Sequence, residues 1–117
     1  MNRLSSTPKG VVLGRLDLIK DGQARNFVLE IGDGRFHGFV VRKGKQVFGY
    51  ADVCPHAGLP LAEELDDYMS SRGDMILCSW HGALFRIKDG YCVGGPCAGQ
   101  RLTKWPVKVK GTDIVTA

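Results

Sequence analysis

The sequence predicts an all-β fold, and three observations support this expectation. The 117 residues include 16 glycines and five prolines, the composition of a chain that turns often. Apolar and β-branched residues come in runs too short for ordinary helices. Glycine-containing turn sequences separate several of these runs, as they do in antiparallel hairpins. A chain of this length forms one domain, residues 1–117, with a core of its own and no room for a second.

The expected strands follow one another closely along the chain. Residues 24–31 alternate, with Phe27, Leu29 and Ile31 on one face, and Gly32-Asp33-Gly34 supplies the hairpin turn after them. Further hairpin turns are expected at residues 43–45 and 89–90. The other expected strands are residues 11–16, 36–41, 46–51, 75–77, 83–87, 91–93, 102–110 and 114–115. Residues 62–69 are expected to form a short helix.

Two short loops each contain one cysteine and one histidine. Cys54-Pro55-His56 is a C-x-H element, and Cys78-Ser79-Trp80-His81 is a C-x-x-H element after 21 intervening residues, 57–77. The proline spacer fixes its own φ and stiffens the first turn. A glycine follows each histidine closely (Gly58 and Gly82) and lets the backbone bend round a bound group and direct N–H donors at it.

Two cysteines and two histidines are the ligands of a [2Fe–2S] cluster with mixed ligation, and also of a tetrahedral zinc ion. Zinc fingers usually space each ligand pair by two or more residues, and they do not repeat a glycine after both histidines. The pattern therefore favours the iron–sulfur cluster. A zinc-binding structural module remains the alternative.

The paired motif resembles the Rieske-type [2Fe-2S] ferredoxin family, in its soluble, oxygenase-associated form, over most of the chain. The resemblance implies an antiparallel β-sandwich base built from both chain ends, with a cluster-binding subdomain inserted at about residues 52–98. It implies one [2Fe-2S] cluster per chain, with Cys54 and Cys78 on one iron and His56 and His81 on the other. Residues expected around the cluster are Pro55, Gly58, Leu59, Trp80, Gly82 and Pro96, the last in a covering loop at residues 94–99.

The sequence departs from the high-potential members of this family in two ways. Those relatives carry an additional cysteine in each ligand loop and join the loops with a disulfide, whereas here Leu59 and Ser79 stand near those positions. They also place a serine and a tyrosine after the second His-Gly, where this chain has Ala83 and Phe85. Without these hydroxyl donors the reduced cluster is less stabilised. We expect a potential toward the negative end of the roughly −150 to +300 mV Rieske range.

The resemblance implies a one-electron carrier between an NAD(P)H-dependent flavoprotein reductase and a terminal oxygenase of the ring-hydroxylating type. A small subunit of an assimilatory nitrite reductase is the runner-up. The chain is not expected to be an enzyme, because His37 is the only histidine outside the motif and cannot build a two-histidine iron site. We find no apolar run that would span a bilayer, no secretory signal and no nucleic-acid-binding pattern, so a cytoplasmic protein is expected.

Two further features lie outside the motif. Residues 57–77 carry five acids and one base, a net charge of −4 in a chain of net +4, and this segment is expected either to dock a basic partner surface or simply to face solvent. Cys92 and Cys97 are not expected ligands. They can approach each other across the covering loop, although a reducing cytoplasm argues against a permanent disulfide.

Overall fold

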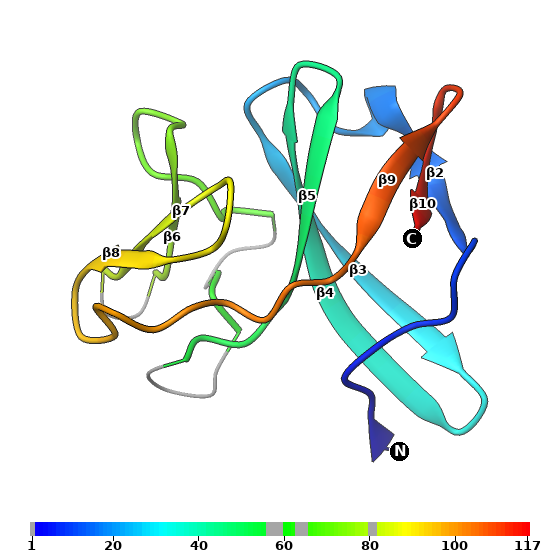
Figure 1. Ribbon diagram of the computed structural model, residues 1–117, viewed down its shortest axis with the longest axis horizontal. Helices are drawn as coiled ribbons and strands as arrows, with labels where there is room; N and C mark the ends of the chain where they lie inside the picture. Colours follow the sequence, from blue (N-terminus) through cyan, green and yellow to red (C-terminus); the bar gives the residue numbers. More distant parts are fainter. Residues whose placement is uncertain (1, 56–59, 63–65, 80–81) are drawn as a thin grey trace.

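The computed structural model describes residues 2–55, 60–62, 66–79 and 82–117. Within these ranges the chain forms ten short strands and a single turn of 3-10 helix, Leu16–Leu18. The strands make three small sheets in a molecule of 35 × 34 × 23 Å (Figure 1). No helix in the described part of the chain is long and apolar enough to cross a membrane.

The first sheet is built on the long strand β4, Gly34–Lys43. Strand β3 (Ala24–Ile31) and strand β5 (Gln46–Ala51) pair with β4 in antiparallel fashion, on either side of it. The short strand β1 (Asn2–Arg3) pairs with the start of β4 in parallel. The two hairpins turn at Gly32 and Gly44, both at positive φ, as the turn sequences predict.

The second sheet joins the two ends of the chain. Its order is β2 (Val12–Arg15), β10 (Asp113–Thr116) and β9 (Val107–Lys110), all antiparallel. The core that it shares with the first sheet is centred on Trp105, whose ring packs 4.7 Å from Phe36 and 6.2 Å from Phe27 between centroids. The indole N–H of Trp105 donates to Oγ1 of Thr7 at 2.9 Å, so its polar atom is satisfied.

The third sheet lies to one side of the other two (Figure 1). It consists of β6 (Met75–Leu77), β7 (Leu84–Arg86) and β8 (Cys92–Gly94), in that order and antiparallel. Ile76 and Phe85 are fully buried on its inner face. Its buried residues form one cluster with residues of the first sheet, among them Phe39, Val41 and Tyr50, so the third sheet packs against the first through a second core.

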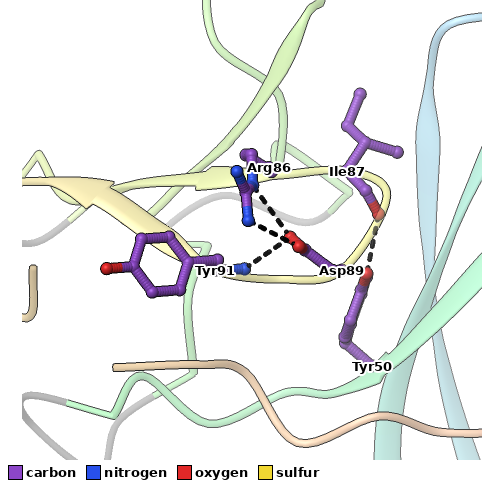
Figure 2. Close-up of polar contacts among 5 residues, drawn as sticks. All are labelled: Tyr50, Arg86, Ile87, Asp89 and Tyr91. Carbon is purple, nitrogen blue, oxygen red and sulfur yellow. Dashed lines mark hydrogen bonds and ion pairs between the residues drawn. The ribbon is translucent and has the colours of Figure 1, made fainter. Parts of the chain in front are cut away.

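A buried hydrogen bond ties the third sheet to the first. The hydroxyl of Tyr50 on β5 donates to the carbonyl oxygen of Ile87 at 2.6 Å (Figure 2). Burial, with a smaller contribution from the charge of Asp89, raises the pKa of Tyr50 to about 12, so this donor stays protonated at any ordinary pH.

The turn between β7 and β8 is closed by Asp89. Its carboxylate accepts two hydrogen bonds from Arg86 and one from the backbone N–H of Tyr91 (Figure 2). The hydrogen bond from Arg86 is the main reason why the pKa of Asp89 is lowered. The predicted hairpin turn at residues 89–90 therefore has a local side-chain cause.

The predicted strands are found with small shifts of their ends, and the all-β fold class is confirmed. The helix predicted at residues 62–69 is wrong for its described part, because Met69 forms an antiparallel bridge with Ile76 and Asp66 adopts φ +64°. The strand predicted at residues 102–110 begins only at Val107, since Pro106 lacks a backbone N–H. The 3-10 helix and the parallel strand β1 were not predicted.

Gly38 on β4 provides a test of the base packing. A Cβ at this position would lie 2.6 Å from ring atoms of both Phe36 and Trp105, which are buried and cannot move aside. Gly38→Ala is expected to lower the free energy of unfolding by about 1–3 kcal/mol, the usual cost of overpacking. Gly94→Ala is the matched control, because no atom lies within 4 Å of its Cβ position. Equal denaturation midpoints for the two variants would contradict this packing.

Candidate metal centre

The two motif cysteines lie in the same buried cluster. Cys54 and Cys78 are both 0% exposed, and none of the four cysteines of the chain is in a disulfide. Of the other residues expected at the site, Pro55 is half-buried, whereas Gly82 and Pro96 are exposed. The predicted ligands His56 and His81, and the predicted neighbours Gly58, Leu59 and Trp80, lie outside the described residues.

The base of the first ligand loop is closed by Asp52, two residues before Cys54. One carboxylate oxygen of Asp52 accepts a hydrogen bond of 2.9 Å from the backbone N–H of Leu61, on the far side of the loop. The backbone N–H of Asp52 donates to the carbonyl oxygen of His37 on β4 at 3.0 Å. The loop therefore starts and ends at one buried side chain that is fixed to the first sheet.

The second carboxylate oxygen of Asp52 binds two more donors. The hydroxyl of Tyr68 donates to it at 2.9 Å and the side-chain amide of Asn26 at 3.2 Å. The same amide donates to the Tyr68 oxygen at 2.8 Å, and the Tyr68 ring stacks on Phe39 at 4.3 Å between centroids. Burial, followed by the charge of Asp52, raises the pKa of Tyr68, so its hydroxyl remains a donor. This network places a carboxylate, only 4% exposed, in an environment that satisfies it.

The second ligand loop closes on its own backbone. The N–H of Cys78 donates to the carbonyl of Ala83, and the N–H of Gly82 donates to the carbonyl of Cys78, both at 2.9 Å. Gly82 has φ +70°, which confirms the predicted bend. The N–H of Gly82 itself is used within the loop by the Cys78 carbonyl, so the predicted N–H donors to a bound group would come from other residues of the loops.

A direct hydrogen bond joins the two ligand loops. The backbone N–H of Ser79 donates to the carbonyl oxygen of Leu61 at 2.8 Å. Leu61 is thus bonded through its N–H to Asp52 and through its carbonyl to the residue that follows Cys78. The spacing between the two cysteine loops is therefore set by the backbone of Leu61, which the buried Asp52 carboxylate holds in place.

The loop predicted to cover the site packs against the second ligand loop. A Cβ on Gly95 would lie 2.7 Å from the Cα of Ala83, so the two backbones are in close contact. Ala83 and Phe85 are both 0% exposed and share the buried cluster with the cysteines. Neither side chain has a hydroxyl, at the two positions where the high-potential relatives have one.

The acidic segment contributes to local structure as well as to charge. Asp66 accepts a hydrogen bond of 2.7 Å from the backbone N–H of Asn26, and Asp74 accepts one of 3.0 Å from Ser70. Asp67 is exposed. Glu63 and Glu64 lie outside the described residues. Docking to a partner therefore remains a prediction. Asp66 and Asp74 are less suited to binding a partner than the sequence suggests, because their carboxylates already accept hydrogen bonds within the chain.

The chemistry of these donors fits an iron–sulfur cluster. Cys54 and Cys78 are buried, are not in a disulfide, and lie on two loops that are hydrogen-bonded to each other. Cysteine thiolates are the ligands that iron–sulfur clusters use. The described residues contain no group of three or more side chains placed to bind a metal. The motif histidines, predicted to supply the two further ligands, lie outside the described ranges.

The roles of Asp52 and Tyr68 were not predicted from the sequence. An aspartate after a predicted strand and a tyrosine in a polar segment are ordinary surface residues by their type. Only the tertiary contact between β3, the first loop and the segment before β6 shows that they act together.

Replacing Asp52 tests the closure of the first loop. Asp52→Ala leaves the N–H of Leu61 and the hydroxyl of Tyr68 without their buried acceptor, so we expect a loss of about 3 kcal/mol in the free energy of unfolding. Less iron should be retained per chain after purification. Asp67→Ala is the control, because that carboxylate is exposed. Normal stability and iron content in Asp52→Ala would show that the loop holds without this carboxylate.

Comparison with known proteins agrees with this site. The model of the Rieske [2Fe-2S] domain matches residues 11–110. The ferredoxin component of a p-cumate 2,3-dioxygenase system from Pseudomonas putida is 35% identical over 71 residues, which cover 59% of this chain and 54% of that protein. Ferredoxin CarAc from Metapseudomonas resinovorans is 32% identical over 78 residues, 67% of each chain.

Among solved structures, a chain in the complex of reduced oxygenase and oxidized ferredoxin in carbazole 1,9a-dioxygenase superposes with a TM-score of 0.72. It is 26% identical, and the match covers 95% of this chain and 94% of that one. The match to the p-cumate relative spans just over half of that protein's length. Because the domain model covers most of the sequence, this chain belongs to the Rieske [2Fe-2S] domain family, whose cofactor is a [2Fe-2S] cluster.

Proposed function

We propose that the protein is a one-electron carrier, a Rieske-type ferredoxin that links an NAD(P)H-dependent flavoprotein reductase to a terminal oxygenase of the ring-hydroxylating type. The observation that carries this proposal is the pair of buried cysteines on two mutually bonded loops of a Rieske domain. The relatives support it, because the one from Pseudomonas putida is named as the ferredoxin component of a dioxygenase system. A bound [2Fe-2S] cluster would supply the one-electron chemistry.

The residues divide into ligands and surroundings. Cys54 and Cys78 would bind the inner iron, and His56 and His81 the outer iron. Pro55, Gly58, Leu59, Trp80, Gly82 and Pro96 would shape the loops around the cluster. The backbone bonds at Leu61 would hold both loops still during electron transfer. We further propose that residues 52–98 are the cluster-binding part of a single domain, 1–117.

We further propose that the protein works in the cytoplasm, with its electron donor and acceptor as protein partners and with no nucleic acid or membrane involved. The relative from Pseudomonas putida supports protein partners of this kind, because it is named as the ferredoxin component of a dioxygenase system. A reducing cytoplasm would keep the thiols of Cys92 and Cys97 free.

Reconstitution tests the proposed function. The purified protein is added to a flavoprotein reductase and a ring-hydroxylating oxygenase with NADH, and hydroxylated product is measured against protein concentration. Product formation should depend on this protein, and the Cys78→Ser variant should support none. Transfer of electrons to a nitrite reductase but not to any oxygenase would instead assign the chain to nitrite assimilation. A protein that neither accepts nor donates electrons would refute the proposal.

The redox potential provides a second test. Phe85→Tyr and Ala83→Ser each place a hydroxyl in the buried cluster that holds the two cysteines. Each is expected to raise the midpoint potential by tens of millivolts, since about 60 mV corresponds to about 1.4 kcal/mol, the size of one hydrogen bond. Phe27→Tyr is the matched control, because Phe27 lies in the separate core of the base. Voltammetry that gave a high wild-type midpoint, with no change in either variant, would contradict this explanation.

A further inference from the structure

Two cysteines outside the ligand motif form a contact pair. The Sγ atoms of Cys92 and Cys97 are 3.0 Å apart, with the Cys97 thiol donating to Cys92. The Cys92 thiol in turn donates to the carbonyl oxygen of Gly94 at 3.2 Å. Cys92 is 1% exposed and Cys97 0% exposed. The pair is thus an ordered dithiol, with both S–H groups directed by hydrogen bonds.

The backbone fixes this contact. The N–H of Cys92 donates to the carbonyl of Gln100, and the carbonyl of Cys92 accepts from the N–H of Gly99. These two bonds fold the segment after β8 back onto the strand. A third bond, from the N–H of Gln100 to the carbonyl of Cys97, tightens the turn. Cys97 is therefore held over Cys92 by the path of the chain.

We propose that Cys92 and Cys97 form a second redox site, a dithiol that a peroxide oxidises reversibly to an intramolecular disulfide. One cysteine, as its thiolate, attacks a peroxide oxygen, breaks the O–O bond and becomes a sulfenic acid, and the departing hydroxide takes up a proton to give water. The second cysteine attacks the sulfenic sulfur, forming the S–S bond and releasing the oxygen as a second water. Two thiols and one hydrogen peroxide thus give one disulfide and two waters. A dithiol reductant reverses the change.

The burial of the pair sets its expected rate. Burial, and to a lesser extent the neighbouring Cys92 and Cys54, raises the pKa of the Cys97 thiol, so it stays protonated while the loop is closed. Oxidation then requires the segment between Gly95 and Gly99, both at positive φ, to lift from β8. We expect a slow reaction, driven by sustained oxidant, in contrast to the fast response of an exposed thiolate sensor.

The Cys92–Cys97 pair is distinct from the predicted ligands but lies close to the loops that carry them. Cys92 and Cys97 share a buried cluster of residues with Cys54 and Cys78, and Gly95 of the same loop contacts Ala83 of the second ligand loop. Oxidation would therefore add a covalent link inside the loop that borders the ligand region. The disulfide itself does not depend on the proposed electron-carrier function.

Peptide mapping of the cluster-loaded protein tests the proposal. The protein is treated with increasing hydrogen peroxide while the cluster absorption is followed, then denatured, alkylated and digested with trypsin. Residues 89–101 form one tryptic peptide that contains both cysteines, whereas Cys54 and Cys78 fall in the separate peptides 46–72 and 73–86. Peptide 89–101 should change from two alkyl groups to none, with the loss of two hydrogens, while the cluster absorption persists. Dithiothreitol should restore both alkyl groups.

The variant Cys97→Ser provides the control. Its peptide 89–101 should never become resistant to alkylation by forming a disulfide, although Cys92 can be trapped as a sulfenic acid. If the wild-type peptide keeps two alkyl groups until the cluster is lost, or if its cysteines pair with Cys54 or Cys78 instead, the proposal is wrong. The wild-type map decides the question even if the variant does not fold. A failure of electron transfer in the reconstituted system would leave this result unaffected.

Discussion

The site depends on one buried carboxylate, that of Asp52. It accepts hydrogen bonds from Leu61, Tyr68 and Asn26, which belong to three different segments of the chain. A buried carboxylate without hydrogen-bond donors would cost much free energy. Its three hydrogen bonds therefore stabilise one arrangement of the three segments. The carbonyl oxygen of Leu61 in turn accepts a hydrogen bond from the backbone N–H of Ser79, in the second ligand loop. The distance between the two cysteine loops thus follows from the position of one side chain.

The apolar residues of the fold form two buried clusters. One cluster is centred on Trp105 in the base, the other contains the two motif cysteines, and β4 and β5 contribute residues to both. The hydroxyl of Tyr50 on β5 donates to the carbonyl oxygen of Ile87, next to β7, and the ring of Tyr68 stacks on Phe39 of β4. Two tyrosines therefore anchor the third sheet and the ligand loops to the base by their rings and by their hydroxyls. The base supports the loops that carry the two motif cysteines.

Much of the fold could be predicted because its causes are local. Turn glycines such as Gly32 and Gly44 need positive φ, and alternating residues such as those of β3 need one buried face. The cysteines were predicted from the motif, and the structure places both in one buried cluster. The approach of Cys92 and Cys97 was likewise anticipated, because the two residues are close in the sequence. The roles of Asp52 and Tyr68 depend on segments that meet only in the folded chain. The same holds for Asp66. Its charge can be read from the sequence, but its hydrogen bond to Asn26, which is 40 residues away, cannot.

The proposed centre is binuclear, with two thiolates on one iron and two imidazoles on the other. Mössbauer spectroscopy of the oxidised, ⁵⁷Fe-enriched protein, together with iron and acid-labile sulfide analysis, distinguishes the two irons by their ligands. We expect two irons and two sulfides per chain, with two distinct ferric signals of equal area, because sulfur and nitrogen ligands surround the irons differently. A single signal from two equivalent irons, or a protein that contains zinc instead of iron, would contradict it.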